Sequence, residues 1–177
     1  MKIFGLVGWS GSGKTTLVAR LLPELIGRGY SVSTMKHTHH NFDIDKKGKD
    51  SFEHRMAGAT EVLITGASRW AILHENRDTP EPPIDDLLAR MEDVDLVLIE
   101  GFKSHSHQKM EIFRPDVGKP LLAVDDASIV AVATDVADLP ELAGHDQALI
   151  GLDDVKAIAD FIVGHTGLEA GARDGAA

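Results

Sequence analysis

A glycine-rich run near the N-terminus has the residues and the spacing of a phosphate-binding loop. Residues 8–15 read Gly-Trp-Ser-Gly-Ser-Gly-Lys-Thr, which fits the pattern G-x-x-x-x-G-K-[ST]. Glycines let the backbone curl so that N–H groups point at phosphate oxygens, and the helix N-terminus that follows adds partial positive charge. Lys14 is expected to reach the β- and γ-phosphates, Thr15 to ligate Mg²⁺ and Thr16 to contact the α-phosphate. The predicted nucleotide-binding residues are Gly11, Ser12, Gly13, Lys14, Thr15 and Thr16.

An acidic residue at the end of a second apolar run is the expected partner of this loop. Residues 96–99 read Leu-Val-Leu-Ile, and Glu100 and Gly101 follow directly. In a parallel sheet the carboxyl ends of the strands line the ligand crevice. The sequence therefore predicts that Glu100 helps to hold Mg²⁺ or orients an attacking water, while Gly101 leaves room for the γ-phosphate.

Two histidine-rich segments also follow predicted strands and should lie near the same edge. One covers residues 36–50 and the other residues 103–107, and together they hold five of the nine histidines, several beside lysines. Three interpretations stay open: recognition of an anionic partner, a transition-metal site of imidazole and carboxylate ligands, or a solvated loop without function. The excess of cations favours an anionic partner. The predicted anion- or partner-binding residues are His37, His39, His40, Lys46, Lys49 and Lys103.

Two aspartates are further candidates. Asp45, ahead of Asp43, could complete the Mg²⁺ shell through water or position the attacking water, which makes it a candidate catalytic residue. Asp135 ends the apolar run 130–134, and its carboxylate could accept hydrogen bonds from the N1 and N2 donors of guanine. Because adenine lacks that pair of donors, Asp135 could select GTP, although an aspartate that merely ends a strand is an equally open interpretation.

Alternating apolar strands and amphipathic helices must position these residues. The apolar runs predict strands at 2–7, 30–35, 61–65, 70–74, 95–99, 110–113 and 129–133. Helical spacing predicts helices at 15–28, 84–91 and 153–163, and a capping box at Asp50 and Glu53 predicts a short helix through Met56. The expected fold is α/β, a single P-loop NTPase domain at 1–163, with a mostly parallel sheet, helices on both faces and some antiparallel strand additions. Residues 164–177 are expected to form a flexible tail.

The composition excludes several classes of protein. The 177 residues contain no cysteine and carry a net charge of −10, so disulfides, thiolate metal sites and cysteine nucleophiles are excluded and a nucleic-acid partner is disfavoured. No signal peptide or membrane span is expected, which favours the cytoplasm. The acid is unevenly spread: residues 75–100 hold nine acidic and two basic residues, whereas residues 36–55 hold four acidic and five basic ones. A small anion could therefore still bind a local basic cleft.

With these residues in place, the chain resembles the MobB family of molybdopterin-guanine dinucleotide biosynthesis adapter proteins. The runs that carry the resemblance are residues 8–17, 36–51, 54–59, 97–103 and 109–114. Two positions depart from the expected pattern: Asn41 stands where an aspartate is expected, and Lys47 stands where a proline is common.

The resemblance implies a GTP-binding homodimer that hydrolyses GTP weakly, at most a slow GTPase, with Mg²⁺ as its cofactor. It also implies a role beside the molybdenum cofactor guanylyltransferase that joins GMP to molybdopterin, and contact with molybdopterin itself stays open. Two alternatives remain, a nickel metallochaperone-type GTPase and a small-molecule P-loop kinase, since one fold can host many activities.

Overall fold

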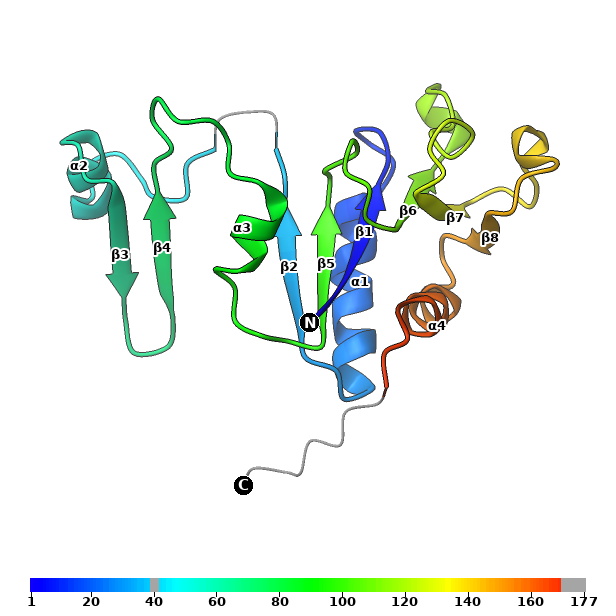
Figure 1. Ribbon diagram of the computed structural model, residues 1–177, viewed down its shortest axis with the longest axis horizontal. Helices are drawn as coiled ribbons and strands as arrows, with labels where there is room; N and C mark the ends of the chain where they lie inside the picture. Colours follow the sequence, from blue (N-terminus) through cyan, green and yellow to red (C-terminus); the bar gives the residue numbers. More distant parts are fainter. Residues whose placement is uncertain (39–41, 170–177) are drawn as a thin grey trace. The chain divides into compact units, whose positions relative to one another are not determined.

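Six parallel strands form the main sheet (Figure 1), in a computed structural model that describes residues 1–38 and 42–169. The strand order is β2-β5-β1-β6-β7-β8. The strands are β1 (Lys2–Val7), β2 (Val32–Lys36), β5 (Leu96–Glu100), β6 (Lys109–Phe113), β7 (Ile129–Thr134) and β8 (Ala148–Gly151). Every neighbouring pair in this sheet is parallel. The loops that leave the carboxyl ends of β1, β2, β5, β6 and β7 therefore emerge at one edge.

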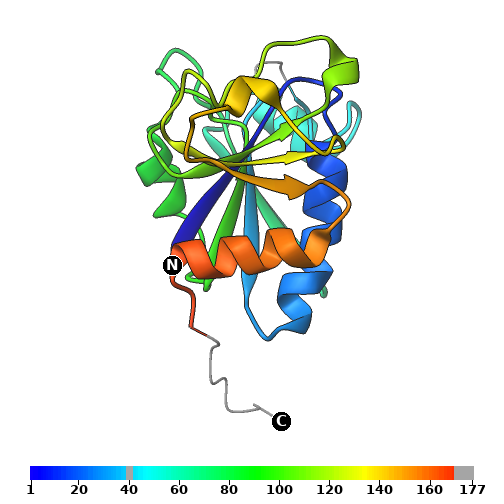
Figure 2. The ribbon, with the colours of Figure 1, turned by 90° about the vertical axis from the view of Figure 1, so that its right-hand side faces the viewer.

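Two helices cover one face of this sheet (Figure 2). They are α1 (Lys14–Gly27) and α4 (Val155–Thr166), which contact each other. Leucines at helical spacing in α1, such as Leu17 and Leu21, are buried against Phe4 and Leu6 of β1, and Ile158 of α4 joins the same core. Burial of each such side chain contributes roughly 2 kcal/mol, so packing against the sheet holds α1 in place although Pro23 lies inside it.

The opposite face over β1, β6 and β7 is covered by chain that has little regular structure. Val7, Phe113 and Val132 pack there against Leu121 and Leu139. The covering segment follows the short 3-10 helix η1 (Pro115–Val117) and includes η2 (Pro140–Leu142). This arrangement brings residues 119–126 close to β6, where they contact the charged side chains described below.

Residues 38–92 form a second, smaller unit, while the main sheet belongs to residues 1–37 and the chain from 93 onward. The smaller unit contains α2 (Asp50–Met56), the antiparallel pair of β3 (Glu61–Thr65) and β4 (Trp70–His74), and α3 (Ile84–Leu88). Gly66 N–H donates to Arg69 O and closes the hairpin. One face of the hairpin leaves large apolar side chains exposed: Leu63, Trp70 and Ile72.

The predicted fold class is confirmed as an α/β fold with a parallel sheet flanked by helices and a small antiparallel pair. Four local predictions need correction. Strand β8 was not expected, α3 ends at Leu88 instead of Met91, and α4 continues to Thr166 instead of ending at Val163. The expected capping box is wrong because α2 begins at Asp50, with Lys49 as its N-cap and no side-chain cap.

Candidate functional site

The glycine-rich loop joins β1 to α1, as its sequence predicts, and its glycines adopt backbone conformations that other residues avoid. Gly8, Gly11 and Gly13 all have positive φ angles. A Cβ at Gly8 would lie 2.4 Å from the carbonyl oxygen of Ile112 in β6. The start of the loop therefore packs tightly against β6, and the end of the loop continues directly into the first turn of α1.

Lys14 folds back over the loop that carries it. Its Nζ donates hydrogen bonds to the carbonyl oxygens of Gly8, at 2.9 Å, and Trp9, at 2.8 Å. Burial lowers the pKa of Lys14, Glu100 opposes the shift, and Lys103 and Lys36 add to it. Three charged side chains, of Glu100, Lys103 and Lys36, thus lie near the ammonium group.

Thr15 and Glu100 meet at the start of α1. The Thr15 hydroxyl donates to Oε1 of Glu100 at 3.0 Å. Lys36 Nζ lies 3.1 Å from the same oxygen and 3.4 Å from Thr15 Oγ1. Lys36 and Glu100 are partners in the β2–β5 register, which explains how residues far apart in sequence meet. A hydroxyl beside a carboxylate is the oxygen donor pair that Mg²⁺ prefers, so these residues fit a magnesium ion.

Arg114 links the loop to the end of β7. Its Nε donates to the carbonyl oxygen of Ser12 at 3.2 Å, and its Nη1 lies 2.8 Å from Oδ2 of Asp135. Asp135 is therefore held beside the phosphate loop by an ion pair. A cleft of about 210 Å³ lies next to Arg114 along α1, and its lining includes Gly13, Thr16 and Arg20. Ser12 itself turns a buried hydroxyl toward Gly8 and donates its backbone N–H to Trp9 O.

Aromatic contacts hold the loop after β5. His37 N–H donates to the carbonyl oxygen of Glu100, and the His37 ring lies 4.5 Å from the ring of Phe102. The ring of His105 packs edge-on against the same Phe102 ring, with 5.1 Å between the two ring centres. Gly101 has φ 101°, and a Cβ there would lie 3.1 Å from the Cβ of His37. The histidines His37 and His105 therefore pack around Phe102.

His107 is placed differently. Its ring lies against the backbone of β1, since a Cβ at Gly5 would come within 2.5 Å of its Nε2. Both ring nitrogens are buried and have no hydrogen-bond partner among the described residues. Burial, with Lys109 and His105 nearby, lowers the pKa of His107 to about 4, and Asp126 opposes the shift. The ring is therefore neutral at physiological pH.

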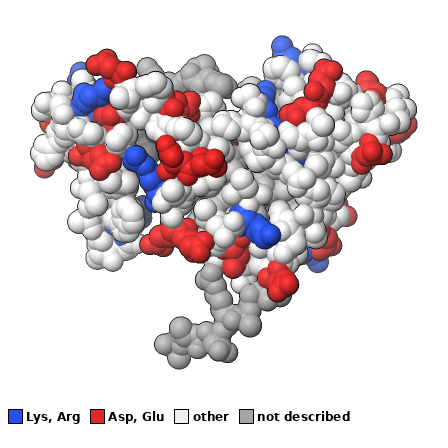
Figure 3. Space-filling model, viewed as in Figure 1, with Lys and Arg blue, Asp and Glu red and all other residues white. Residues whose placement is uncertain are grey.

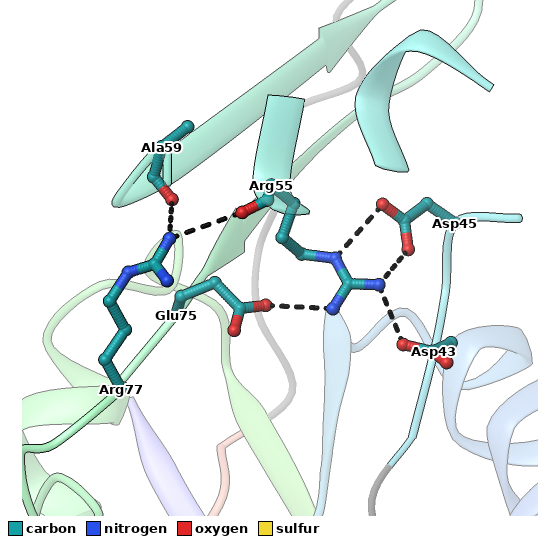
Figure 4. Close-up of polar contacts among 6 residues, drawn as sticks. All are labelled: Asp43, Asp45, Arg55, Ala59, Glu75 and Arg77. Atoms are coloured by element: carbon teal, nitrogen blue, oxygen red, sulfur yellow. Dashed lines mark hydrogen bonds and ion pairs between the residues drawn. The ribbon is translucent and has the colours of Figure 1, made fainter. Parts of the chain in front are cut away.

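Asp45 lies in the smaller unit and is paired with Arg55 (Figure 4). Its carboxylate accepts from Arg55 Nη2 at 2.8 Å and from Nε at 3.2 Å, and its side chain is 2% exposed. Asp43 and Glu75 also contact the Arg55 guanidinium, and these hydrogen bonds, first of all the one from Asp45, raise the pKa of Arg55. The catalytic role of Asp45 stays a prediction, but its oxygens already have a structural partner.

The other residues predicted to bind an anion are divided between the two units. Lys46 and Lys49 are exposed in the smaller unit, whereas Lys103 lies in the main unit beside Lys14. His39 and His40 lie outside the described residues. On the face drawn in Figure 3, blue basic atoms occur singly or in small groups among the red acidic ones. Within residues 1–38 and 42–169, no three His, Asp or Glu side chains gather closely enough to hold a metal ion.

Several contacts of this site were missed from the sequence. Arg114, Lys36 and Arg55 each pair with a predicted site residue, yet all three lie in other segments of the chain. Arg114 belongs to the run 109–114, which resembles the family pattern, but the sequence predicts no physical role for this residue. No helix in the described part of the chain is long and apolar enough to cross a membrane.

Comparison with known proteins agrees with this geometry. The chain is 41% identical to the molybdopterin-guanine dinucleotide biosynthesis adapter protein of Escherichia coli (strain K12) over 91% of both chains. It is 43% identical to the protein of the same name from Haemophilus influenzae, over 90% of this chain and 86% of that one. A crystal structure of molybdopterin-guanine biosynthesis protein B superposes with a TM-score of 0.71 and 26% identity, covering 92% of this chain and 99% of the other. Residues 3–135 match the family described as molybdopterin guanine dinucleotide synthesis protein B, so the chain belongs to the MobB family.

Proposed function

We propose that this protein is a GTP-binding adapter in the biosynthesis of molybdopterin guanine dinucleotide. The observation that carries the proposal is the Thr15–Glu100 pair at the N-terminus of α1, directly after a glycine loop that holds Lys14. The fold alone would not support this proposal, because P-loop folds host many activities. The names of the two adapter relatives support the pathway.

Each end of the nucleotide has residues suited to it. Thr15 and Glu100 would hold Mg²⁺, which when bound would neutralise charge on the β- and γ-phosphates. Lys14 would leave the carbonyl oxygens of its own loop for phosphate oxygens, a charge-assisted contact that is stronger than the one it replaces. The helix N-terminus and the N–H groups of residues 11–16 would bind the remaining phosphate oxygens.

Guanine selection is assigned to Asp135, beside the cleft that runs along α1. Its carboxylate would accept hydrogen bonds from N1 and N2 of guanine, as the sequence predicts. The ion pair with Arg114 supports this assignment in one respect, since it holds the carboxylate next to the phosphate loop. Guanine must then share Asp135 with Arg114 or displace it.

The protein would act mainly by binding, with slow GTP hydrolysis at most. Its partners would be the molybdenum cofactor guanylyltransferase and a second copy of this chain. The exposed apolar face formed by Leu63, Trp70 and Ile72 supports the homodimer, because a two-stranded hairpin is marginally stable alone and gains from covering such a face. Sedimentation of the protein and of a Leu63→Lys, Ile72→Lys variant would test this part: a dimer is expected for the first and a monomer for the second.

Nucleotide binding is tested by calorimetry with GTP, GDP and ATP, each with and without Mg²⁺. GTP is expected to bind most tightly and to need Mg²⁺ for its full affinity. Lys14→Ala should weaken GTP binding by at least about 100-fold, whereas Lys2→Ala, at the other end of β1, should leave it unchanged. Equal GTP affinity in the Lys14→Ala variant would refute the site, and tight Ni²⁺ binding in place of GTP binding would favour a metallochaperone.

A further inference from the structure

Two lysines from different loops rest on one tryptophan at the rim of the phosphate loop. Lys103 Nζ lies 4.0 Å from the centre of the Trp9 ring, and Lys119 Nζ lies 5.9 Å from the same point. Both ammonium groups therefore lie near the same side chain of the phosphate loop. Neither ammonium group has a carboxylate within ion-pair distance in the part of the chain that the structure describes.

The tryptophan and the Lys119 loop are fixed by a buried carboxylate. Trp9 Nε1 donates to the carbonyl oxygen of Pro120 at 2.8 Å. The next residues are held by Glu111 of β6, which accepts from Leu122 N at 2.9 Å and from Ala123 N at 2.8 Å. Glu111 is fully buried and burial raises its pKa, so this carboxylate is held at a cost in desolvation.

The Lys103 loop is fixed in the same way by a buried ammonium group. Lys109 lies two residues before Glu111 on the same face of β6 and is 0% exposed. Its Nζ donates to the carbonyl oxygens of Lys103 and His105 and lies 3.2 Å from Asp126. One strand thus fixes both loops that carry the lysines.

Burial of both Lys109 and Glu111 costs more desolvation free energy than a strand that only supports the fold would need. Burial of charged groups is often no more stabilising than apolar side chains of the same volume. Apolar residues could pack between β6 and residues 121–126 without holding the backbone of two loops in defined positions. The buried charges of Lys109 and Glu111 are therefore better explained by a need to hold two loops in place, so that Lys103 on one and Lys119 on the other lie beside Trp9.

We infer that Trp9, Lys103 and Lys119 form a second anion site, separate from the nucleotide phosphates, that binds the phosphate group of a second ligand. The ligand class is a phosphomonoester, whose dianion can accept hydrogen bonds from two ammonium groups at once. Lys109 and Glu111 act as positioning residues. The inference rests on the proposed function, because it places this phosphate beside bound GTP, near Lys14, whose pKa Lys103 helps to lower.

The test uses the full chain saturated with Mg²⁺ and a non-hydrolysable GTP analogue, which fills the β- and γ-phosphate positions. Inorganic phosphate is titrated at constant ionic strength while the two tryptophan indole N–H signals are followed by ¹⁵N NMR. The Trp9 signal should shift and saturate, because its N–H donates to Pro120 in the Lys119 loop, and the Trp70 signal should stay in place. Lys103→Gln with Lys119→Gln should weaken the apparent affinity at least about fivefold.

The matched control carries Lys2→Gln and Lys156→Gln, which remove the same charge from exposed positions of β1 and α4. It should titrate like the unchanged protein. An unsaturable shift, or one that is equal in both double variants, would overturn the site. Phosphate binding to the GDP form but not to the analogue form would also overturn it, since the anion would then occupy the γ-phosphate position.

The positioning role has its own measurement. Glu111→Gln keeps the shape of the side chain and should shift the Trp9 indole signal before any phosphate is added, with a weaker phosphate affinity. If the analogue fails to bind, the proposed function fails by itself. The same phosphate titration of the Lys14→Ala variant, which lacks the main phosphate contact of the loop, then still tests the second site.

Discussion

The Thr15 hydroxyl and the Glu100 carboxylate are joined by a hydrogen bond of 3.0 Å across the space between α1 and β5. Lys36 contacts the same carboxylate oxygen at 3.1 Å and balances its charge. A magnesium ion bound at Thr15 would therefore meet a carboxylate that is already in place. Lys36 would then compete with the ion for the carboxylate, which makes nucleotide affinity sensitive to both partners.

Mg²⁺ is expected to increase the affinity for GTP. Substitution of Glu100 by Gln should reduce this increase by about tenfold. The reason is that an amide keeps the shape of the side chain but loses the charge that attracts the ion. Calorimetric titration with and without Mg²⁺ measures the gain, and Glu92→Gln, an exposed carboxylate in the smaller unit, is the control. Full Mg²⁺ dependence in Glu100→Gln would remove this residue from the metal site.

The ion pair of Arg114 and Asp135 separates two roles for the aspartate. Asp135→Asn should lower GTP affinity more than ATP affinity, because the amide presents a donor to the guanine donors. Arg114→Gln should instead weaken both nucleotides by similar factors, because it loosens the contact with Ser12 of the phosphate loop. Competition binding with GTP and ATP measures both ratios. An equal loss of both nucleotides in Asp135→Asn would leave the residue as a support for Arg114 alone.

Two substitutions distinguish a structural role of the buried Asp45 carboxylate from a catalytic one. Arg55→Met should destabilise the smaller unit, because the buried carboxylate of Asp45 would lose the guanidinium group that it contacts in Figure 4. Hydrogen exchange of residues 43–77 measures this change locally. Asp45→Asn should raise exchange in the same residues. Slower GTP hydrolysis in Asp45→Asn with unchanged exchange would favour the catalytic role that the sequence predicts.

The sequence predicted the local elements better than the contacts between them. Apolar periodicity locates β1 and β5, and the spacing of Gly8, Gly13 and Lys14 identifies the phosphate loop, because these signals lie within a few residues of each other. Strand β8 escaped because its four residues follow a polar stretch and are too short to show a pattern.

Contacts that join distant segments left little trace in the sequence. In β6, Lys109 and Glu111 alternate with Met110 and Ile112, a pattern typical of a strand with one face in solvent. The structure buries both faces because backbone groups of the two neighbouring loops satisfy the charges. Likewise, Arg114 reaches Ser12 across more than half of the chain, and no periodicity predicts such a pair.

Acid should destabilise the protein through His107. Burial lowers the pKa of this ring to about 4 in the folded protein, from 6.5 when exposed. Between these two values the unfolded chain binds a proton that the folded protein does not, so the free energy of unfolding falls as the pH decreases from about 6.5 to 4. The loss should reach about 2 kcal/mol, after allowance for solvent screening of a half-buried ring.

Urea unfolding at a series of pH values measures this slope in the protein and in His107→Asn. The variant is less stable at every pH because it leaves a cavity against Gly5, but its stability should change less between pH 6.5 and 4. His145→Asn, at an exposed histidine, should keep the full slope. Because Lys109, His105 and Asp126 all act on the His107 ring, Asp126→Asn should steepen the slope by removing a nearby carboxylate that raises its pKa. Identical slopes in the protein and in His107→Asn would show that this ring is not the group that titrates.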